Sequence, residues 1–260
     1  MVGVVGPNPT VDTSVKMMRQ AMIFAAGLGT MLKPLTDTMP KALVRVGGHP
    51  LLWYVVTKLK AAGYERIVVN VHHFSQQIID YLQANGNFGL DIRISDETGG
   101  LLETGGGIRK ALPLFDPESP ILIHNVDILS NLDLNALPTD TPLLVVSQRQ
   151  TKRYLLFDDD MRLQGWTNIE TGEVKGPVAE GQRSTVEGPL NKFAFSGIHV
   201  FHPSLAPLLT EWPERFPIMD FYLKSCASHL IKGVAVNDLR LLDVGKLDTL
   251  HEAEAFIEGL

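Results

Sequence analysis

The stretch "AMIFAAGLGTMLKPLTDTMPKAL", residues 21–43, contains the most informative pattern in the chain. Its apolar run ends at residues 25–27 in two alanines and a glycine, so no bulky side chain keeps a ligand away from the backbone. Residues 27–30, Gly-Leu-Gly-Thr, can then present successive backbone N–H groups to an anion. The stretch therefore predicts a strand that ends in an anion-binding turn.

Two common phosphate-binding motifs do not fit this turn. A Walker loop is excluded because no Gly-Lys-Ser/Thr follows at the required spacing. A dinucleotide-binding fingerprint needs a third small residue and a continuous helix, and Pro34 interrupts that helix. The two glycines alone are compatible with a purely structural turn, so the surrounding sequence must decide their role.

The composition predicts a cytoplasmic globular protein. The chain has 260 residues, 45% of them hydrophobic and 20% charged, and no apolar run long enough to span a membrane. A net charge of -6 argues against broad nucleic-acid binding but permits a local anion site. Residues 1–18 show no hydrophobic period, which predicts a poorly ordered extension, or else an added edge strand, ahead of a single domain at 19–260.

The first half of the chain alternates strand-like and helix-like patterns. The expected strands are 21–25, 66–71, 91–95, 121–124 and 143–147, and the expected helices are 50–62, 75–84 and 104–112. This rhythm predicts an α/β fold with a mostly parallel central sheet and helices on both faces. In such sheets ligands bind at the carboxyl ends of the strands.

The second half departs from this alternation. We expect a hairpin that turns through the aspartates at 158–160, a strand within 190–201, and helices at 218–229 and 246–259. A turn of this kind needs no calcium ion to explain its three aspartates. No repeat or linker is visible, so this half is predicted to continue the same domain.

Residues 27–43 resemble the signature of the sugar-1-phosphate nucleotidyltransferases, roughly G-x-G-T-R-[LM]-[RK]-P-L-T followed by P-K-x-L. The resemblance extends over essentially everything after residue 19, through "LLETGGGIRKALPLF" (101–115), "ILIHNVDILSN" (121–131), "FAFSGIHVF" (193–201) and "LLDVGKLDTLHEAE" (241–254). The ETGGGI form is most similar to the N-acetylmuramate-1-phosphate uridylyltransferase branch of that family.

The resemblance implies a Rossmann-like nucleotidyltransferase fold and a defined reaction. An oxygen of a sugar 1-phosphate attacks the α-phosphorus of a nucleoside triphosphate, and pyrophosphate leaves. UTP and N-acetylmuramate 1-phosphate are the first choices, while a mannose-1-phosphate guanylyltransferase and a phosphocholine cytidylyltransferase remain alternatives. A nucleotide-binding regulator with impaired turnover is a further alternative. No nucleic-acid or membrane partner is expected, and the protein is expected to be a monomer or small homo-oligomer.

The resemblance also implies site residues. Asp127 and Asp243 would bind Mg²⁺ and act in catalysis with Lys41, although an isolated strand-end aspartate more often caps a helix. The nucleotide would contact Ala25, Ala26, Gly27, Leu28, Gly29, Thr30, Lys41, Glu103, Gly105, Gly106 and Asn125. The sugar would contact Arg153, Tyr154, Ser196 and Gly197. Three aromatic residues, Trp166, Phe193 and Phe195, can line a sugar pocket or belong to the core.

One residue departs from the signature. The family has arginine where this chain has Met31, and methionine offers an apolar chain in place of a guanidinium. Two hypotheses remain open: either the enzyme has lost a phosphate contact, or another cation performs that role and Met31 is packed.

Overall fold

The computed structural model describes residues 17–179, 181 and 188–260. The predicted extension therefore lies, except for Met17 and Met18, outside the described residues. Ten strands form the central sheet: β1 (Gln20–Phe24), β4 (Arg66–Val71), β5 (Asp91–Asp96), β6 (Ile121–Asn125), β8 (Leu143–Ser147), β9 (Arg153–Phe157), β10 (Leu163–Asn168), β11 (Val174–Lys175), β12 (Asn191–Phe201) and β13 (Lys232–Ala235).

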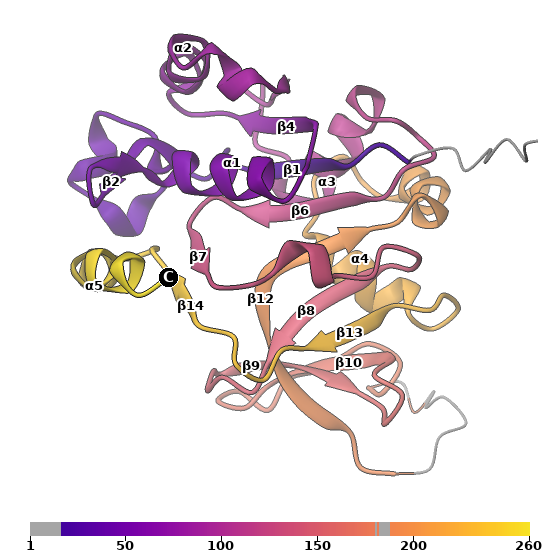
Figure 1. Cartoon of the computed structure of the whole chain (residues 1–260). Coiled ribbons are helices and arrows are strands. Elements are labelled where there is room, and N and C mark those ends of the chain that lie inside the picture. Colours follow the sequence, from indigo (N-terminus) through magenta and orange to yellow (C-terminus); the bar gives the residue numbers. More distant parts are fainter. Residues whose placement is uncertain (1–16, 180, 182–187) are drawn as a thin grey trace, which may run out of the picture.

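The sheet is mixed, with its parallel part built from the first half of the chain (Figure 1). Its order is β11-β10-β9-β12-β6-β1-β4-β5, and β8 pairs with both β12 and β13. Strands β6, β1, β4 and β5 are parallel, as predicted from the alternating rhythm. The long β12 runs antiparallel to β6, β8 and β9. The predicted α/β class with a mixed, parallel-centred sheet is therefore confirmed.

Alternate residues of the parallel strands supply two separate cores. Ala21 and Ile23 of β1 join one buried cluster, whereas Met22 between them joins the other. Helices α1 (Leu51–Ala61) and α2 (Ser75–Ala84) cover the first face, and α3 (Glu103–Ala111) and α4 (Ile218–Ser225) cover the second. This arrangement follows from the two-residue side-chain period of a strand.

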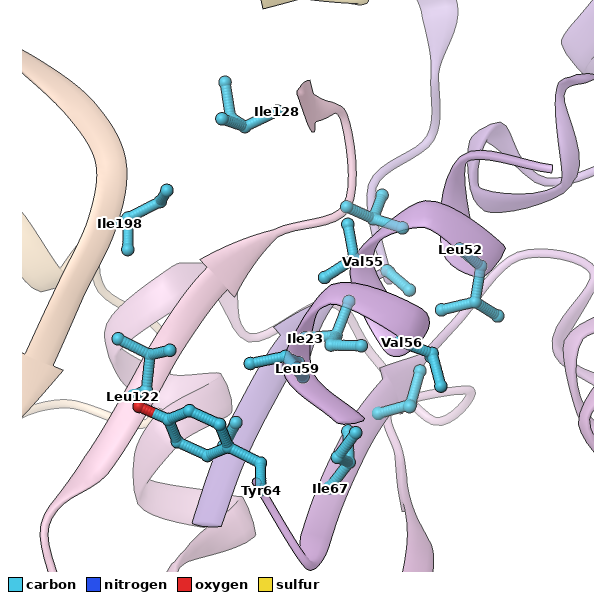
Figure 2. Packing of buried hydrophobic residues seen from close by; sticks show 14 of the residues in the cluster. Ile23, Leu52, Val55, Val56, Leu59, Tyr64, Ile67, Leu122, Ile128 and Ile198 are labelled. Carbon is cyan, nitrogen blue, oxygen red and sulfur yellow. The ribbon is translucent and has the colours of Figure 1, made fainter. Parts of the chain in front are cut away.

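Figure 2 shows the first core, in which the apolar face of α1 lies over β1, β4 and β6. Leu52, Val55, Val56 and Leu59 of α1 are essentially inaccessible to solvent. Burying one such side chain completely stabilises the fold by about 1.5–3 kcal/mol. The helix therefore fixes the position of the strand ends that lie beyond it.

Several helix boundaries differ from the sequence prediction, all but one of them by a single residue. Helix α1 starts one residue late, because Pro50 occupies the N-cap position. Helix α4 ends at Ser225, four residues before the predicted end. The amides of Ser228 and His229 both donate to the carbonyl of Ser225, which turns the chain so that Ile231 is buried before β13.

The predicted hairpin is present between β9 and β10. Asp158 is buried, and its Oδ1 accepts from the amides of Asp160 and Arg162 at 3.0 and 2.8 Å. These bonds satisfy the turn without an ion. Among the described residues, no helix has the length and apolar character that crossing a membrane requires.

A second, two-stranded sheet brings the end of the chain back to the parallel strands (Figure 1). It consists of β7 (Ile128–Ser130) and β14 (Leu241–Asp243), and helix α5 (Leu247–Glu258) follows. A third small core joins α5, β7 and the hairpin of β2 (Arg45–Val46) and β3 (His49–Pro50).

Candidate active site

The carboxyl ends of β1, β4 and β6 open into a cavity of about 430 Å³, which we call the first cavity. It lies where ligands bind in open parallel sheets. Seven residues singled out from the sequence line it: Ala25, Ala26, Gly27, Lys41, Glu103, Asn125 and Asp127. The tertiary structure thus gathers residues from four segments that are distant in sequence.

The turn after β1 keeps its backbone donors free. In the described part of the chain, no amide of residues 27–30 donates a hydrogen bond to another protein group. Gly29 has φ 64°, and a Cβ there would lie 2.9 Å from Thr36 Cγ2 and 3.1 Å from Lys41 Cβ. A glycine is therefore required at this position, and the free amides form a site suited to a phosphate.

Within this turn the structure separates the residues that face the first cavity from the others. Ala25, Ala26 and Gly27 line it, whereas Leu28, Gly29 and Thr30 follow beyond its lining. Leu28 is 46% exposed. The predicted nucleotide contacts of these last three residues stay predictions, and they require a ligand that extends past Gly27 over the free amides.

Lys41 connects the turn to the catalytic candidates. Its Nζ forms a salt bridge with Asp127 Oδ2, and both side chains are largely buried, at 15% and 18% exposed. Asp127 lies two residues after the end of β6, and its carbonyl accepts from the amide of Val244 at 2.9 Å. That bond ties the strand end of Asp127 to the segment that carries Asp243.

Asp243 lies beside the same pair. A Cβ on Gly245 would lie 2.7 Å from Asp243 Oδ1 and 3.6 Å from Lys41 Nζ, so glycine is needed for this close approach. Partial burial raises the pKa of Asp243, and the nearby carboxylate of Asp127 raises it further, while Lys41 opposes both effects. Two carboxylates that repel each other beside a phosphate-sized turn fit a divalent cation with oxygen ligands.

Two buried polar residues that the sequence analysis missed support the turn. Asn70 Oδ1 accepts from the amides of Ala25 and Ala26 at 2.7 and 3.2 Å. Asn70 Nδ2 donates to Glu97 Oε1 at 2.8 Å, and Glu97 Oε2 accepts from the amide of Leu102 at 3.1 Å. The chain of bonds links the turn after β1 to the start of α3. In the sequence, the signal for these bonds is Asn70, the single side-chain amide in "RIVVNV" at 66–71, because a buried amide needs hydrogen-bond partners.

The glycines of α3 pack against another segment and are not exposed to the first cavity. The amides of Gly105 and Gly106 both donate to the carbonyl of Phe216, at 2.8 and 3.3 Å. A Cβ on Gly105 would collide with the Phe216 ring, and one on Gly106 with the Glu214 carbonyl. The base contact predicted for these two glycines stays a prediction, and it cannot use their amides, which already donate to Phe216. Glu103 and Thr104 face the cavity instead.

A second cavity of about 390 Å³ adjoins the first. The two cavities share Phe24, Thr104, Asn125 and Pro217. The strands β9, β10 and β11 form one wall, through Leu155, Trp166 and Lys175, which lie opposite one another in the strand register. Two ligands can therefore meet beside Asn125.

The four predicted sugar-contacting residues divide between this cavity and its support. Arg153 lines the second cavity. Tyr154 does not line it: the adjacent side chain of a strand points to the opposite face, where the Tyr154 hydroxyl accepts from the amide of Thr151 at 3.1 Å. Ser196 is 2% exposed and lines neither cavity, so its predicted sugar contact stays a prediction without a place in either cavity.

Gly197 also acts through packing. It has φ 79°, and a Cβ would lie 2.9 Å from Asn125 Nδ2. The absence of a side chain lets β12 pass close to Asn125, a residue shared by both cavities, while the predicted sugar contact of Gly197 stays a prediction. Of the three aromatic candidates, Trp166 and Phe195 line the second cavity, while Phe193 packs in the core.

Met31 is 62% exposed on a short 3₁₀ turn, η1 (Thr30–Leu32). The hypothesis that this side chain is packed is therefore wrong. The nearby cation Lys33 forms a salt bridge of 3.1 Å with Asp37 in its own loop.

A parallel sheet with a phosphate-sized turn, a buried lysine and paired carboxylates at its carboxyl edge defines an enzyme that acts on nucleotides. Residues 20–140 match the family model described as "Nucleotidyl transferase". The N-acetylmuramate alpha-1-phosphate uridylyltransferase of Caulobacter vibrioides is 32% identical over 237 residues, which cover 90% of this chain and 95% of that protein. The chain belongs to the nucleotidyl transferase family.

A second relative and a solved structure are also similar to this chain. The protein of the same name from Neisseria meningitidis serogroup B is 44% identical over 117 residues, which cover 45% of this chain and 50% of that protein. The inositol-1-phosphate CTP transferase of T. maritima superposes with a TM-score of 0.71 at 16% identity, over 93% of this chain and 97% of that one. This last likeness shows the fold alone.

Proposed function

We propose that this enzyme couples UTP to N-acetylmuramate 1-phosphate, giving the UDP sugar and pyrophosphate. The observation that carries the proposal is the pair of adjoining cavities that share Asn125 and Thr104. One has the phosphate-binding turn and the Lys41–Asp127 pair, and the other has an apolar and cationic wall. The names of the two relatives with uridylyltransferase activity support the choice of substrates.

The chemistry needs alignment and charge neutralisation more than a base. The nucleophile is already a phosphate anion, so no proton has to be removed before it attacks. The free amides of residues 27–30 would hold the triphosphate, and Lys41 would neutralise the charge that moves onto the leaving pyrophosphate. The shared residue Asn125 would orient the two substrates.

Members of this family use a divalent metal, and we propose Mg²⁺ here. Asp127 and Asp243 would hold the ion, which neutralises phosphate charge when it is bound.

Because UTP and sugar 1-phosphates are cytoplasmic metabolites, the proposed reaction takes place in the cytoplasm and would supply cell-wall synthesis. A monomer or small homo-oligomer is part of the proposal and is measurable by light scattering.

A substrate panel tests this function. Four nucleoside triphosphates are each combined with several sugar phosphates and phosphocholine, and pyrophosphate release is measured with Mg²⁺ present. We expect UTP with N-acetylmuramate 1-phosphate to give the highest kcat/KM. Tighter calorimetric binding of GTP than of UTP would instead support the guanylyltransferase alternative, and preference for CTP with phosphocholine the cytidylyltransferase one. UTP binding without turnover would support the regulator.

Met31→Arg is expected to raise kcat by about 30- to 1,000-fold, the range associated with one charge-assisted contact that strengthens in the transition state. The exposed Met31 side chain leaves room for a guanidinium on the loop that carries the free amides. Steady-state kinetics with saturating Mg²⁺ should show a larger change in kcat than in the Kd for UTP. An unchanged or lower kcat in a folded variant would show that Met31 does not limit turnover.

A further inference from the structure

Side chains of residues 149–155 form a cationic edge along the second cavity. Arg149, Thr151, Arg153 and Leu155 all line it. Arg153 and Leu155 lie two residues apart on β9 and so share one face of the strand, whereas Arg149 and Thr151 belong to the loop before β9, which bends at Lys152. The intervening residue Lys152 points away and pairs with Glu170 at 2.6 Å.

The three cations of the second cavity have different environments. Lys175 is balanced by two carboxylates, Glu173 at 3.6 Å and Asp220 at 3.8 Å. Arg149 donates to the carbonyl of Phe195 at 3.1 Å. The guanidinium of Arg149 is therefore already bound to the backbone of β12.

Arg153 differs from the other two cations because its side chain has no partner among the described residues. Its guanidinium forms no hydrogen bond or ion pair within the described part of the chain, although its backbone amide donates to Thr151 Oγ1 at 3.3 Å. It comes from the same strand as Leu155 and lines the same cavity as Trp166 and Phe195. A guanidinium beside an apolar wall suits a planar carboxylate attached to a largely hydrocarbon group.

We infer that Arg153 binds a carboxylate on the sugar, so that the second cavity selects an acidic sugar 1-phosphate over its neutral analogue. This inference rests on the proposed function. The lactyl ether of N-acetylmuramate supplies such a group: its carboxylate would pair with Arg153, and its methyl would lie against the apolar wall. N-acetylglucosamine 1-phosphate has the same phosphate and acetamido group but no carboxylate.

The test compares these two substrates in three proteins with UTP and Mg²⁺. We expect Arg153→Gln to lower kcat/KM for N-acetylmuramate 1-phosphate by about 10- to 100-fold, mainly through KM, since one charge-assisted contact is lost. The same variant should change kcat/KM for N-acetylglucosamine 1-phosphate by less than about threefold, because that sugar offers Arg153 no anion. Lys152→Gln, which removes the adjacent outward-pointing cation, should leave both values near those of the unmodified enzyme.

The outcomes distinguish a failure of this inference from a failure of the proposed function. If the unmodified enzyme releases no pyrophosphate from UTP and N-acetylmuramate 1-phosphate, the proposed function fails. If the unmodified enzyme is active but Arg153→Gln slows both sugars equally, or neither, the inference is overturned and the function stands. Calorimetric UTP binding and the thermal unfolding midpoint show whether each variant is folded. Arg153→Lys should restore part of the preference, because it keeps the charge but not the planar fork.

Discussion

Asp127→Asn is expected to lower kcat by about 10³-fold or more, with Asp243→Asn of similar size. Both carboxylates lie near Lys41, and together they would provide the oxygen ligands and negative charge for the divalent cation proposed above. Asparagine keeps the shape of the side chain but removes that charge. Pyrophosphate release, titrated with Mg²⁺ at saturating substrates, should show lower turnover and a higher Mg²⁺ requirement.

The matched control is Asp37→Asn. Asp37 is 49% exposed and pairs only with Lys33 among the described residues, in the loop after β1. Its replacement should leave turnover within about twofold, because an exposed ion pair contributes little. Near-normal turnover in the double variant of Asp127 and Asp243 would show that these carboxylates are not the metal ligands.

Lys41→Gln is expected to lower kcat by about 10²- to 10³-fold, the size associated with losing one preorganised electrostatic contact. The lysine side chain is 85% shielded from solvent and is held between Asp127 and the backbone around Gly29. Its loss removes the buried cation and leaves Asp127 without its partner. Stopped-flow release of pyrophosphate should fall more than the affinity for UTP does.

Lys60→Gln serves as the control for a lysine far from the cavities. Lys60 Nζ donates to the carbonyl of Phe88 at 2.5 Å on the exposed end of α1. Its kinetic constants should match those of the unmodified enzyme. A Lys41→Gln enzyme with unchanged kcat would assign charge neutralisation to another group.

Much of the fold could be predicted because each strand carries its own local signal. The apolar runs of β1, β4 and β6 identify buried parallel strands, and the alanines and glycine at 25–27 leave the backbone there uncovered by large side chains. Lys41, Asp127 and Asp243 could be proposed as site residues because their short motifs are specific. Local sequence was less informative in the second half, where the antiparallel strands follow from pairing with β12.

The sequence by itself determined the alternating pattern, the glycine-rich turn after β1 and the identity of the charged candidates. Only the tertiary structure decided which of them meet. Asp243 reaches Lys41 because β14 pairs with β7, and the Asn70–Glu97 bond forms because parallel pairing brings β4 beside β5. Neighbouring residues such as Arg153 and Tyr154 separate onto opposite faces of a strand. The physical reason is that a motif specifies chemistry locally, while distances between motifs are set by long-range strand pairing and close packing at glycines.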